Sequence, residues 1–461
     1  MLVTKIRAKE IRTMTHDLTT GKPLRDIWQF AVPVLFGLLL QQVYSLVDTA
    51  IVGHALGVMA LGGVGATGSV NFLVIGFCGG LCTGMAIPLA QAFGAGDYRQ
   101  LRRYVAGCVW LGIAMSALLL ALTLPTTQAL LKLMGTPEEQ MGYAYDYIFI
   151  IFIGIPATIL YNMGACVLRS LGDSKSPVWF LAIASVINIV LDLLTVCVLG
   201  MGVAGAALAS LASRVLAAVI VTKLICHKSN PIHVNRLFHF EWNGDILRRI
   251  LGIGVPNGME NGVFQVGKLV VSNLIAGLST SVIAANAICN TVSGLVCVPG
   301  NAIGLALITV VGQCVGARAI REAQTNVKKL MFFTYGCMLV LNVFLFFLAA
   351  PVVALFDLSE LATTISIDLL KQYAVFNSIF WPLSFPFANA LRAAGDAKYT
   401  MWTSIGSMVL IRVGLSYLFI LGPMDMGIYG VWNAMYVDWI VRIAFFLPRY
   451  LKGKWKTMSA V

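Results

Sequence analysis

Long apolar stretches alternate with short polar segments along the whole chain. Each stretch holds about 20 residues or more, enough for a helix to cross a hydrocarbon core of roughly 30 Å. Irregular backbone cannot face lipid, so the stretches must be helical. The pattern predicts an all-α polytopic membrane protein. Its twelve predicted transmembrane helices cover residues 27–50, 58–91, 104–124, 143–168, 177–199, 202–224, 250–277, 281–312, 329–350, 371–391, 400–420 and 427–448.

The distribution of charge predicts how these spans are oriented in the membrane. The net charge of +12 could suggest a nucleic-acid partner. If the spans alternate from an internal first segment, however, 26 of the 32 Lys and Arg residues fall in internal segments or at the adjoining span ends, and only 2 fall in external loops or at their edges. Such a bias is the positive-inside signal of membrane proteins. It predicts that both termini are cytoplasmic, and it removes the reason to expect nucleic-acid binding.

The sequence is also duplicated. The segment Leu-Arg-Ser-Leu-Gly-Asp-Ser-Lys at 168–175 recurs as Leu-Arg-Ala-Ala-Gly-Asp-Ala-Lys at 391–398, an offset of 223 residues. Each half contains six predicted spans, an even number, so the halves are parallel repeats that form two lobes around a central cleft. The expected parts are a cytoplasmic N-terminal segment (1–26), an N-terminal lobe (27–224), a cytoplasmic linker (225–249), a C-terminal lobe (250–448) and a cytoplasmic tail (449–461).

Carboxylates inside the predicted spans of the first half are the strongest functional signal. An ionisable group in hydrocarbon is costly. Asp48 lies in the first span, and Asp192 lies in the fifth, one turn after Asn188. A short external hairpin after the fifth span places Ser210 at a similar depth. Such a group fits a shared proton or a bound Na⁺; the alternative is that each aspartate only hydrogen-bonds a neighbouring helix.

The second half is not a copy in this respect. The offset of 223 residues takes Asp48 to Val271 and Asp192 to Leu415, so the carboxylate pair belongs to the first half alone. This asymmetry suggests that one lobe senses the driving ion while the other chiefly holds the substrate.

Other charged residues occupy the predicted spans of the second half. Asp438 and Arg442 are spaced i, i+4, which favours a structural ion pair. Glu260 and Lys268 lie on one predicted helix near mid-membrane. Glu260 either attracts a cationic ligand or pairs with Lys268 or Arg412.

The segment at 41–57, Gln-Gln-Val-Tyr-Ser-Leu-Val-Asp-Thr-Ala-Ile-Val-Gly-His-Ala-Leu-Gly, closely resembles the first helix of the multidrug and toxic-compound extrusion (MATE) family. Segments 91–97, 168–173, 188–192 and 202–207 fall where that family has similar motifs. The resemblance extends from about residue 22 to 450. It implies a V-shaped pair of six-helix lobes that exports cationic, often aromatic, compounds in exchange for H⁺ or Na⁺.

The resemblance also implies the residues of the coupling-ion site. The family's first-lobe site carries over onto Asp48, Asn188, Asp192 and Ser210, where Ser210 replaces a more usual Thr but keeps the hydroxyl.

A second-lobe cation site is not expected from the resemblance. One branch of the family has an acidic residue where this chain has Gln265, and Glu260 stands more than a turn earlier. We expect the substrate cavity to include Gln42, Tyr44, Glu260 and Gln265.

Other classes of membrane protein fit less well. A lipid-linked precursor flippase of the same superfamily is the nearest alternative, although the twelve spans and the carboxylate pair argue against it. In a major-facilitator antiporter, the glycine, acidic and basic residues of the corresponding loop are spaced differently from those at 94–103 here. A membrane-embedded enzyme is disfavoured by the lack of HExxH and GxSxG motifs, and a channel by the lack of a selectivity filter.

We therefore expect a secondary active antiporter, not an enzyme, that works by alternating access in the bacterial cytoplasmic (inner) membrane. It should need no cofactor beyond the coupling ion, H⁺ or Na⁺, and no metal beyond a possible Na⁺ at Asp48 and Asp192. Its expected partners are cationic or amphipathic small molecules and the lipid bilayer. We expect a functional monomer.

Overall fold

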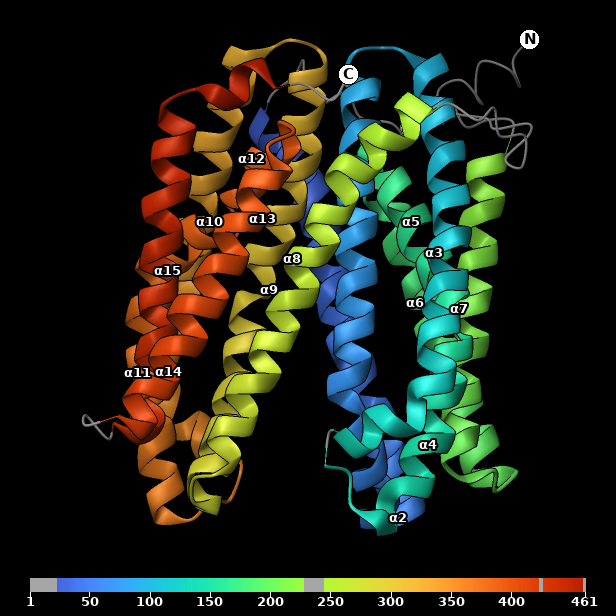
Figure 1. The fold of residues 1–461 in the computed structure, drawn as a ribbon. Coiled ribbons are helices and arrows are strands. Elements are labelled where there is room, and N and C mark those ends of the chain that lie inside the picture. Colours follow the sequence, from blue (N-terminus) through green and yellow to red (C-terminus); the bar gives the residue numbers. More distant parts are fainter. Residues whose placement is uncertain (1–22, 134, 228–243, 423–425, 459–461) are drawn as a thin grey trace.

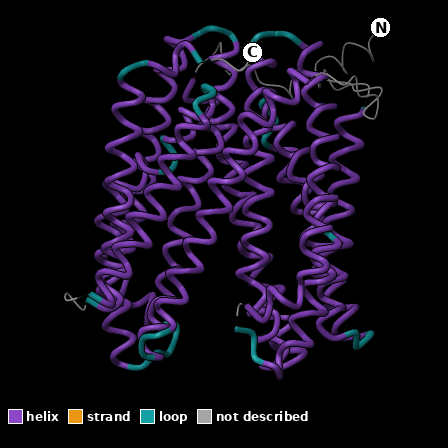
Figure 2. The backbone as a smooth tube through the Cα atoms, viewed as in Figure 1, coloured by secondary structure: helices purple, strands orange, loops and turns teal. Residues whose placement is uncertain are grey.

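The computed structural model describes residues 23–133, 135–227, 244–422 and 426–458, and within these ranges it consists of helices joined by turns, without strands (Figure 2). Two helical bundles stand side by side, one from each half of the chain (Figure 1). The N-terminal lobe contains α2 (Pro23–Gly94), α3 (Tyr98–Leu133), α4 (Glu138–Ile153), α5 (Ile155–Ser170), α6 (Lys175–Asp192), the π-helix η1 (Leu193–Val198) and α7 (Gly202–Cys226). The C-terminal lobe contains α8 (Gly244–Ala276), α9 (Thr280–Gly316), α10 (Ile320–Ala354), α11 (Glu360–Ser384), α12 (Ala388–Ala393), α13 (Ala397–Gly406), the π-helix η2 (Ser407–Val413), α14 (Gly414–Leu421), α15 (Gly427–Leu451) and the 3₁₀-helix η3 (Lys454–Thr457).

The helices confirm a two-lobe membrane architecture with twelve spans. Among the described residues, eight helical segments are long and apolar enough to cross a membrane, and the α4–α5 pair, bent by 49°, makes a ninth. The more highly charged helices α8, α11 and α15, with 33, 25 and 25 residues, supply the other three. Each lobe therefore contributes six.

Several boundaries differ from the predicted ones. The first two spans are joined directly within α2 by a kink at Gly57, where the predicted spans leave a gap at 51–57. Gly57 has φ 81°, a backbone conformation that costs glycine little and other residues more. The second lobe begins at Gly244, six residues before the predicted start. The predicted N-terminal segment up to residue 22, and residues 228–243 of the predicted linker, lie outside the described residues.

The repeated sequence builds the same helix end twice. At the end of α5 the N–H groups of Gly172 and Asp173 donate to the carbonyl oxygens of Arg169 (2.9 Å) and Leu168 (3.0 Å), and Gly172 has φ 85°. The equivalent bonds in the segment 391–396 also measure 2.9 and 3.0 Å. Such a turn favours glycine at its left-handed position. The glycine of the motif is therefore repeated because both turns need the same backbone conformation.

Two glutamines join the lobes at the end of the molecule where these turns lie. Gln91 Nε2 donates to the carbonyl oxygen of Ala393 (2.7 Å), and Gln313 Nε2 donates to that of Ser170 (2.8 Å). Each glutamine thus reaches the repeated turn of the opposite lobe. The contact is a crossed, nearly symmetric pair.

Two glycines allow the backbones to approach at this contact. A Cβ at Gly94 would stand 2.0 Å from the carbonyl oxygen of Gln313, and one at Gly316 would stand 1.9 Å from that of Gln91. No side chain fits at either position. We call the four residues Gln91, Gly94, Gln313 and Gly316 the crossed gate. The bundles converge at this end and diverge toward the other (Figures 1 and 2).

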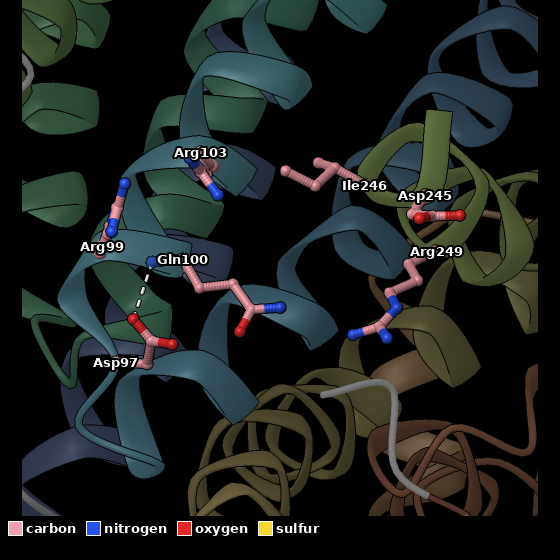
Figure 3. Close-up of a pocket in the computed structure, with 7 residues that line it drawn as sticks. All are labelled: Asp97, Arg99, Gln100, Arg103, Asp245, Ile246 and Arg249. Carbon is pink, nitrogen blue, oxygen red and sulfur yellow. Dashed lines mark hydrogen bonds between the residues drawn. The ribbon is translucent and has the colours of Figure 1, made fainter. Parts of the chain in front are cut away.

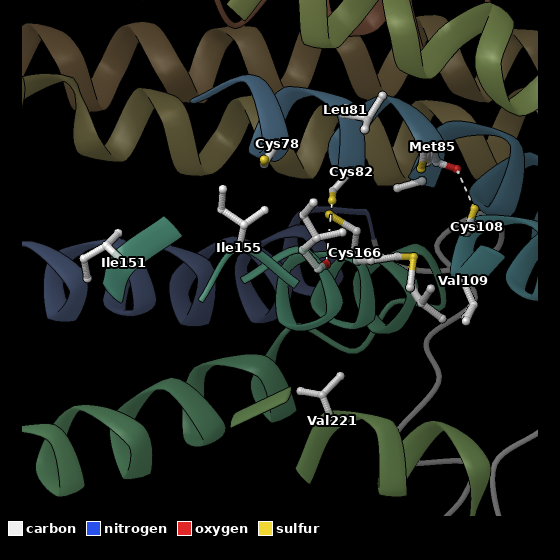
Figure 4. Packing of buried hydrophobic residues seen from close by; sticks show 14 of the residues in the cluster. Cys78, Leu81, Cys82, Met85, Cys108, Val109, Ile151, Ile155, Cys166 and Val221 are labelled. Atoms are coloured by element: carbon white, nitrogen blue, oxygen red, sulfur yellow. Dashed lines mark hydrogen bonds between the residues drawn. The ribbon is translucent and has the colours of Figure 1, made fainter. Parts of the chain in front are cut away.

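Cysteines fill gaps in the core of the N-terminal lobe. Cys78, Cys82, Cys108 and Cys166 lie among buried apolar side chains (Figure 4), and Cys108 Sγ donates to the carbonyl oxygen of Met85 at 4.0 Å. All ten cysteines of the chain are free of disulfides. The four in this core act as small buried hydrophobic residues.

Candidate functional site

Two carboxylates meet inside the N-terminal lobe. Asp48 lies on α2, nine residues before the kink at Gly57, and Asp192 is the last residue of α6. Asp48 is 8% exposed and Asp192 is fully buried. The two side chains lie close enough to act on each other electrostatically. The Oδ1 atom of each nevertheless has no hydrogen-bond partner within the described part of the chain.

A buried amide links this pair to α7. With the Asn188 amide oriented to satisfy both of its ends, Nδ2 donates to Asp192 Oδ2 (3.1 Å) and Oδ1 accepts from the backbone N–H of Ser210 (3.2 Å). The structure therefore brings together the four residues Asp48, Asn188, Asp192 and Ser210, which we call the carboxylate cluster. Its chemistry suits a proton or a small hard cation. No three His, Cys, Asp or Glu side chains of the described residues form a metal-binding group.

A π-helix begins directly after Asp192. Over Leu193–Val198 the helix is wider than an α-helix. Such segments are rare, and they often accompany functional sites. Asp192 thus stands at a break in the regular helical hydrogen-bond pattern.

A cavity of about 270 Å³, which we call the N-lobe cavity, opens onto the carboxylate cluster. Asp48, Asn188 and Ser210 line it, whereas Asp192 does not. Gln42 and Tyr44, which we expect at the substrate cavity, also lie in its wall. Further polar lining comes from Gln41, Ser45, Asn71, Tyr147, Thr158, Tyr161, Asn162, Arg169, Ser174, Ser185, Ser213 and Arg214.

Arg214 is a site residue that the sequence reasoning missed. It acts electrostatically on Asp48, and its Nη1 donates to Thr158 Oγ1 at 3.1 Å. The signal was present, because Arg214 follows Ser210 by four residues on one helix face. A cation beside the carboxylate pair partly balances its charge.

A second cavity, of about 400 Å³, lies in the C-terminal lobe and reaches α2 of the first; we call it the C-lobe cavity. Gln265, the third residue expected at the substrate cavity, lies in its wall. The other lining residues are Ser69, Phe72, Lys268, Leu269, Val271, Ser272, Ile275, Asn286, Asn290, Arg412, Val431, Trp432 and Met435. None of them is acidic.

Glu260 occupies a different place from the one expected. It lines neither the N-lobe nor the C-lobe cavity and forms a bidentate ion pair with Arg392, in which Arg392 Nε donates to Glu260 Oε2 at 3.2 Å. Lys268 and Arg412, the two partners considered from the sequence, do not pair with it. The side chains of Glu260 and Arg392 are 8% and 11% exposed. A paired, buried carboxylate is poorly placed to attract a cationic ligand.

The predicted ion pair on α15 is confirmed. Arg442 Nε donates to Asp438 Oδ1 at 2.9 Å, and both side chains are buried. Ser407 Oγ also donates to Asp438 Oδ1, and Arg442 Nη2 donates to the carbonyl oxygen of Ser404 at 3.2 Å.

A third cavity, of about 370 Å³, lies between the starts of α3 and α8 (Figure 3). Its wall carries three arginines and two carboxylates, and the Asp97 carboxylate accepts from the N–H of Gln100 at 2.9 Å. The arginines belong to segments that the charge bias predicts to be cytoplasmic. The charged residues that line it are Asp97, Arg99, Arg103, Asp245 and Arg249.

Comparison with known proteins agrees with this architecture. The MatE family model matches twice, over residues 33–194 and 256–418, once in each lobe. Probable multidrug resistance protein YpnP of Bacillus subtilis is 28% identical over 96% of this chain and 98% of its own. Probable multidrug resistance protein NorM of Thermotoga maritima is 25% identical over 95% and 94%. A crystal structure of MATE in the bent conformation has a TM-score of 0.87 at 24% identity and covers 96% of this chain and 98% of that one. The chain therefore belongs to the MatE family of membrane transporters.

Proposed function

We propose that this protein is a secondary active antiporter that exports cationic or amphipathic drug-like compounds from a bacterial cell across the cytoplasmic membrane. The coupling ion, H⁺ or Na⁺, binds at Asp48 and Asp192, and Asn188 and Ser210 complete its site. The observation that carries the proposal is the unpartnered Oδ1 atom of each of the two adjacent buried carboxylates. Two negative charges in a low-dielectric interior need a positive counterpart that can arrive and leave.

The geometry supports coupling because the coupling-ion site opens onto the N-lobe cavity, so the charge of the cavity wall depends on the bound ion. Gln42 and Tyr44 line the N-lobe cavity together with Asp48. An ion that binds there changes both the charge of the wall and its hydrogen bonding. It can drive a conformational change only if it binds the two states of the protein unequally.

The closed and open ends support alternating access. The crossed gate closes the end that carries the basic segments, and the lobes diverge at the other end (Figure 1). With the basic end in the cytoplasm, this arrangement is an outward-facing state. The return step opens the gate by rocking two rigid lobes, which we place at about 27–224 and 250–448 with the linker 225–249 between them. Both cavities and the gate lie within one chain, which supports a functional monomer.

Relatives support drug export as the class of function. Both YpnP and NorM are named as probable multidrug resistance proteins, and they match over nearly the whole chain. A lipid-linked precursor flippase is the second candidate. The positive C-lobe cavity favours it, because such a protein must hold a pyrophosphate. The carboxylate cluster argues against it, because a flippase has no evident need for a pair of buried acidic residues.

Ethidium efflux from proteoliposomes tests the proposal. The full-length wild type, Asp48→Asn and Asp192→Asn would be compared under an imposed pH gradient and, separately, an imposed Na⁺ gradient. Asp368→Asn is the matched control, because Asp368 is an exposed carboxylate on α11. We expect one gradient to drive efflux by the wild type and the control. Each cluster variant should lose roughly tenfold or more, since losing about 1.4 kcal/mol of ion binding changes an affinity tenfold.

Two outcomes would contradict the proposal. If both cluster variants match the wild type, the carboxylates are structural and the site assignment fails. If the wild type moves no ethidium under either gradient, the export of cations fails, and flipping of a fluorescent lipid-linked pyrophosphate becomes the activity to measure.

A further inference from the structure

The C-lobe cavity carries positive charge without a matching negative wall. Lys268 and Arg412 line it, and no Asp or Glu does. A third cation, Arg442, lies next to them. All three surround one aromatic ring: Lys268 Nζ is 5.4 Å from the ring centre of Phe264, Arg412 Cζ 5.6 Å and Arg442 Cζ 5.7 Å.

The nearby carboxylates do not balance these cations. Asp438 is bonded to Arg442, and Glu260 is bonded to Arg392. Asp438 also acts electrostatically on Arg412, so this one carboxylate serves two guanidinium groups. The structure gives the side chain of Arg412 no hydrogen-bond or ion-pair partner in the ranges it describes, and its Nε atom is buried.

The Phe264 ring cannot substitute for an anion. A cation–π contact is much weaker than a direct ion pair and leaves the guanidinium donors unused. Three cations around one ring also repel one another, and this repulsion is stronger inside a membrane protein than in water. The cluster is therefore an unfavourable arrangement unless a negative group joins it.

Local backbone geometry singles out Arg412 further. It lies in η2, a π-helical segment at Ser407–Val413, on the helix that corresponds in the repeat to the one carrying Asp192. Among the described residues, π-helix occurs only here and in η1, directly after Asp192. Since π-helical segments often accompany functional sites, the pair of segments points to one site in each lobe.

We propose that the C-lobe cavity binds the anionic group of an aromatic substrate, with Lys268 and Arg412 holding a carboxylate or phosphate. The planar guanidinium of Arg412 suits two-point binding of such a group. Trp432 and Phe72 supply aromatic wall, and the cavity of about 400 Å³ falls within the roughly 300–1,000 Å³ typical of small-molecule sites. This inference rests on the proposed export function and adds to its cargo amphipathic aromatic compounds that carry a negative group.

The shape of the cavity also links this site to transport. Phe72 and Ser69 belong to α2 of the N-terminal lobe, while Lys268 and Arg412 belong to the C-terminal lobe. Rocking one lobe against the other must therefore change the cavity. A substrate held by the cations would then meet a different wall in each state.

Calorimetric titration of the purified full-length protein in detergent tests the site. The probes are 2-naphthoate, its uncharged counterpart 2-naphthamide, and farnesyl diphosphate as an anion on a non-aromatic lipid chain. The variants are Arg412→Met, Lys268→Met and the charge-conserving Arg412→Lys. Lys371→Met is the matched control, because Lys371 is a cation of the same lobe that is exposed on α11 and does not line the cavity.

We expect the wild type to bind 2-naphthoate at least roughly tenfold more tightly than 2-naphthamide, a difference of about 1.4 kcal/mol. Arg412→Met and Lys268→Met should lose that preference, Arg412→Lys should retain part of it, and the control should keep it. Equal binding of the acid and the amide, or no binding of the acid, would overturn the proposal, as would an unchanged preference in Arg412→Met. Tighter binding of farnesyl diphosphate than of 2-naphthoate would overturn the aromatic assignment and favour a lipid anion.

Titration needs no ion gradient, so its result is independent of the efflux experiment. If naphthoate binding fails while gradient-driven efflux succeeds, only the anion site is wrong. If the binding succeeds while efflux fails, the cavity is a real anion site in a protein that is not a cation-coupled exporter of ethidium.

Discussion

The two lobes end a helix with the same turn but differ in their buried charges: one holds a pair of carboxylates and the other a cluster of three cations. Asp48 and Asp192 face each other in the N-terminal lobe, whereas Lys268, Arg412 and Arg442 surround Phe264 in the C-terminal lobe. The offset of 223 residues maps these three cations onto the uncharged Ser45, Ile189 and Val219.

This contrast indicates which parts of a duplicated sequence must stay alike. The repeated turns and the crossed gate need particular backbone conformations and close approaches, so both copies keep Gly172 and Gly395, Gly94 and Gly316. The interior charges need no such symmetry, and under our two proposals each lobe binds a different ligand. In this account the architecture is duplicated and the binding chemistry is divided between the lobes.

The largest predicted effect is a difference in folding stability between an aspartate variant of the C-terminal lobe and one of the N-terminal lobe. Asp438→Ala should destabilise the protein by about 3–5 kcal/mol, because it leaves the buried Arg442 without its partner. Asp192→Asn should cost about 1 kcal/mol or less, because it relieves repulsion with Asp48. Unfolding of both purified variants in a denaturant series measures the difference. Equal losses in the free energy of unfolding would show that the two aspartates contribute equally to stability, which contradicts the prediction.

A smaller effect should distinguish the two copies of the repeated arginine. Arg392→Gln breaks the buried pair with Glu260 and should cost about 3 kcal/mol. Arg169→Gln should cost about 1 kcal/mol, because Arg169 donates to the backbone carbonyl of Ala165 (3.2 Å) and has no ion pair within the described ranges. Melting temperatures of the two variants rank them. The reverse order would mean that Arg169 has a stronger partner than its backbone contact.

The crossed gate should respond to one added methyl group. Gly94→Ala and Gly316→Ala should each cost about 1–3 kcal/mol, because the new Cβ meets the facing backbone and forces the lobes apart. Gly79→Ala on α2 is the matched control, since a Cβ there meets nothing within 4 Å. Melting temperature and efflux rate report the effect. If Gly94→Ala matches the control in both melting temperature and efflux rate, the close approach of the backbones at the gate contributes nothing to stability or transport.

Much of this could be predicted from the sequence, for physical reasons. The apolar stretches fix the spans, the repeat fixes the lobes, and the short hairpin after the fifth span places Ser210 beside Asn188 and Asp192. The i, i+4 spacing of Asp438 and Arg442 also fixes their pair. These features depend on local geometry or on a single short connection.

Other features depend on contacts between distant segments. Glu260 and Arg392 are 132 residues apart, and nothing local links them. The convergence of Lys268, Arg412 and Arg442 on Phe264 involves three separate helices, and no sequence pattern marks the π-helix that carries Arg412. The kink at Gly57 was also missed, because glycines are common within these spans.

The most direct test of the divided chemistry is a thermal-shift comparison of Asp192→Asn and Arg412→Met against the wild type. Each protein would be titrated with Na⁺, with pH, and with 2-naphthoate, because a ligand that binds the folded state raises its melting temperature. We predict that Asp192→Asn loses the response to the ion and keeps the response to naphthoate, while Arg412→Met shows the reverse. If either variant loses both responses or keeps both, the two lobes do not divide ion and substrate in the way proposed.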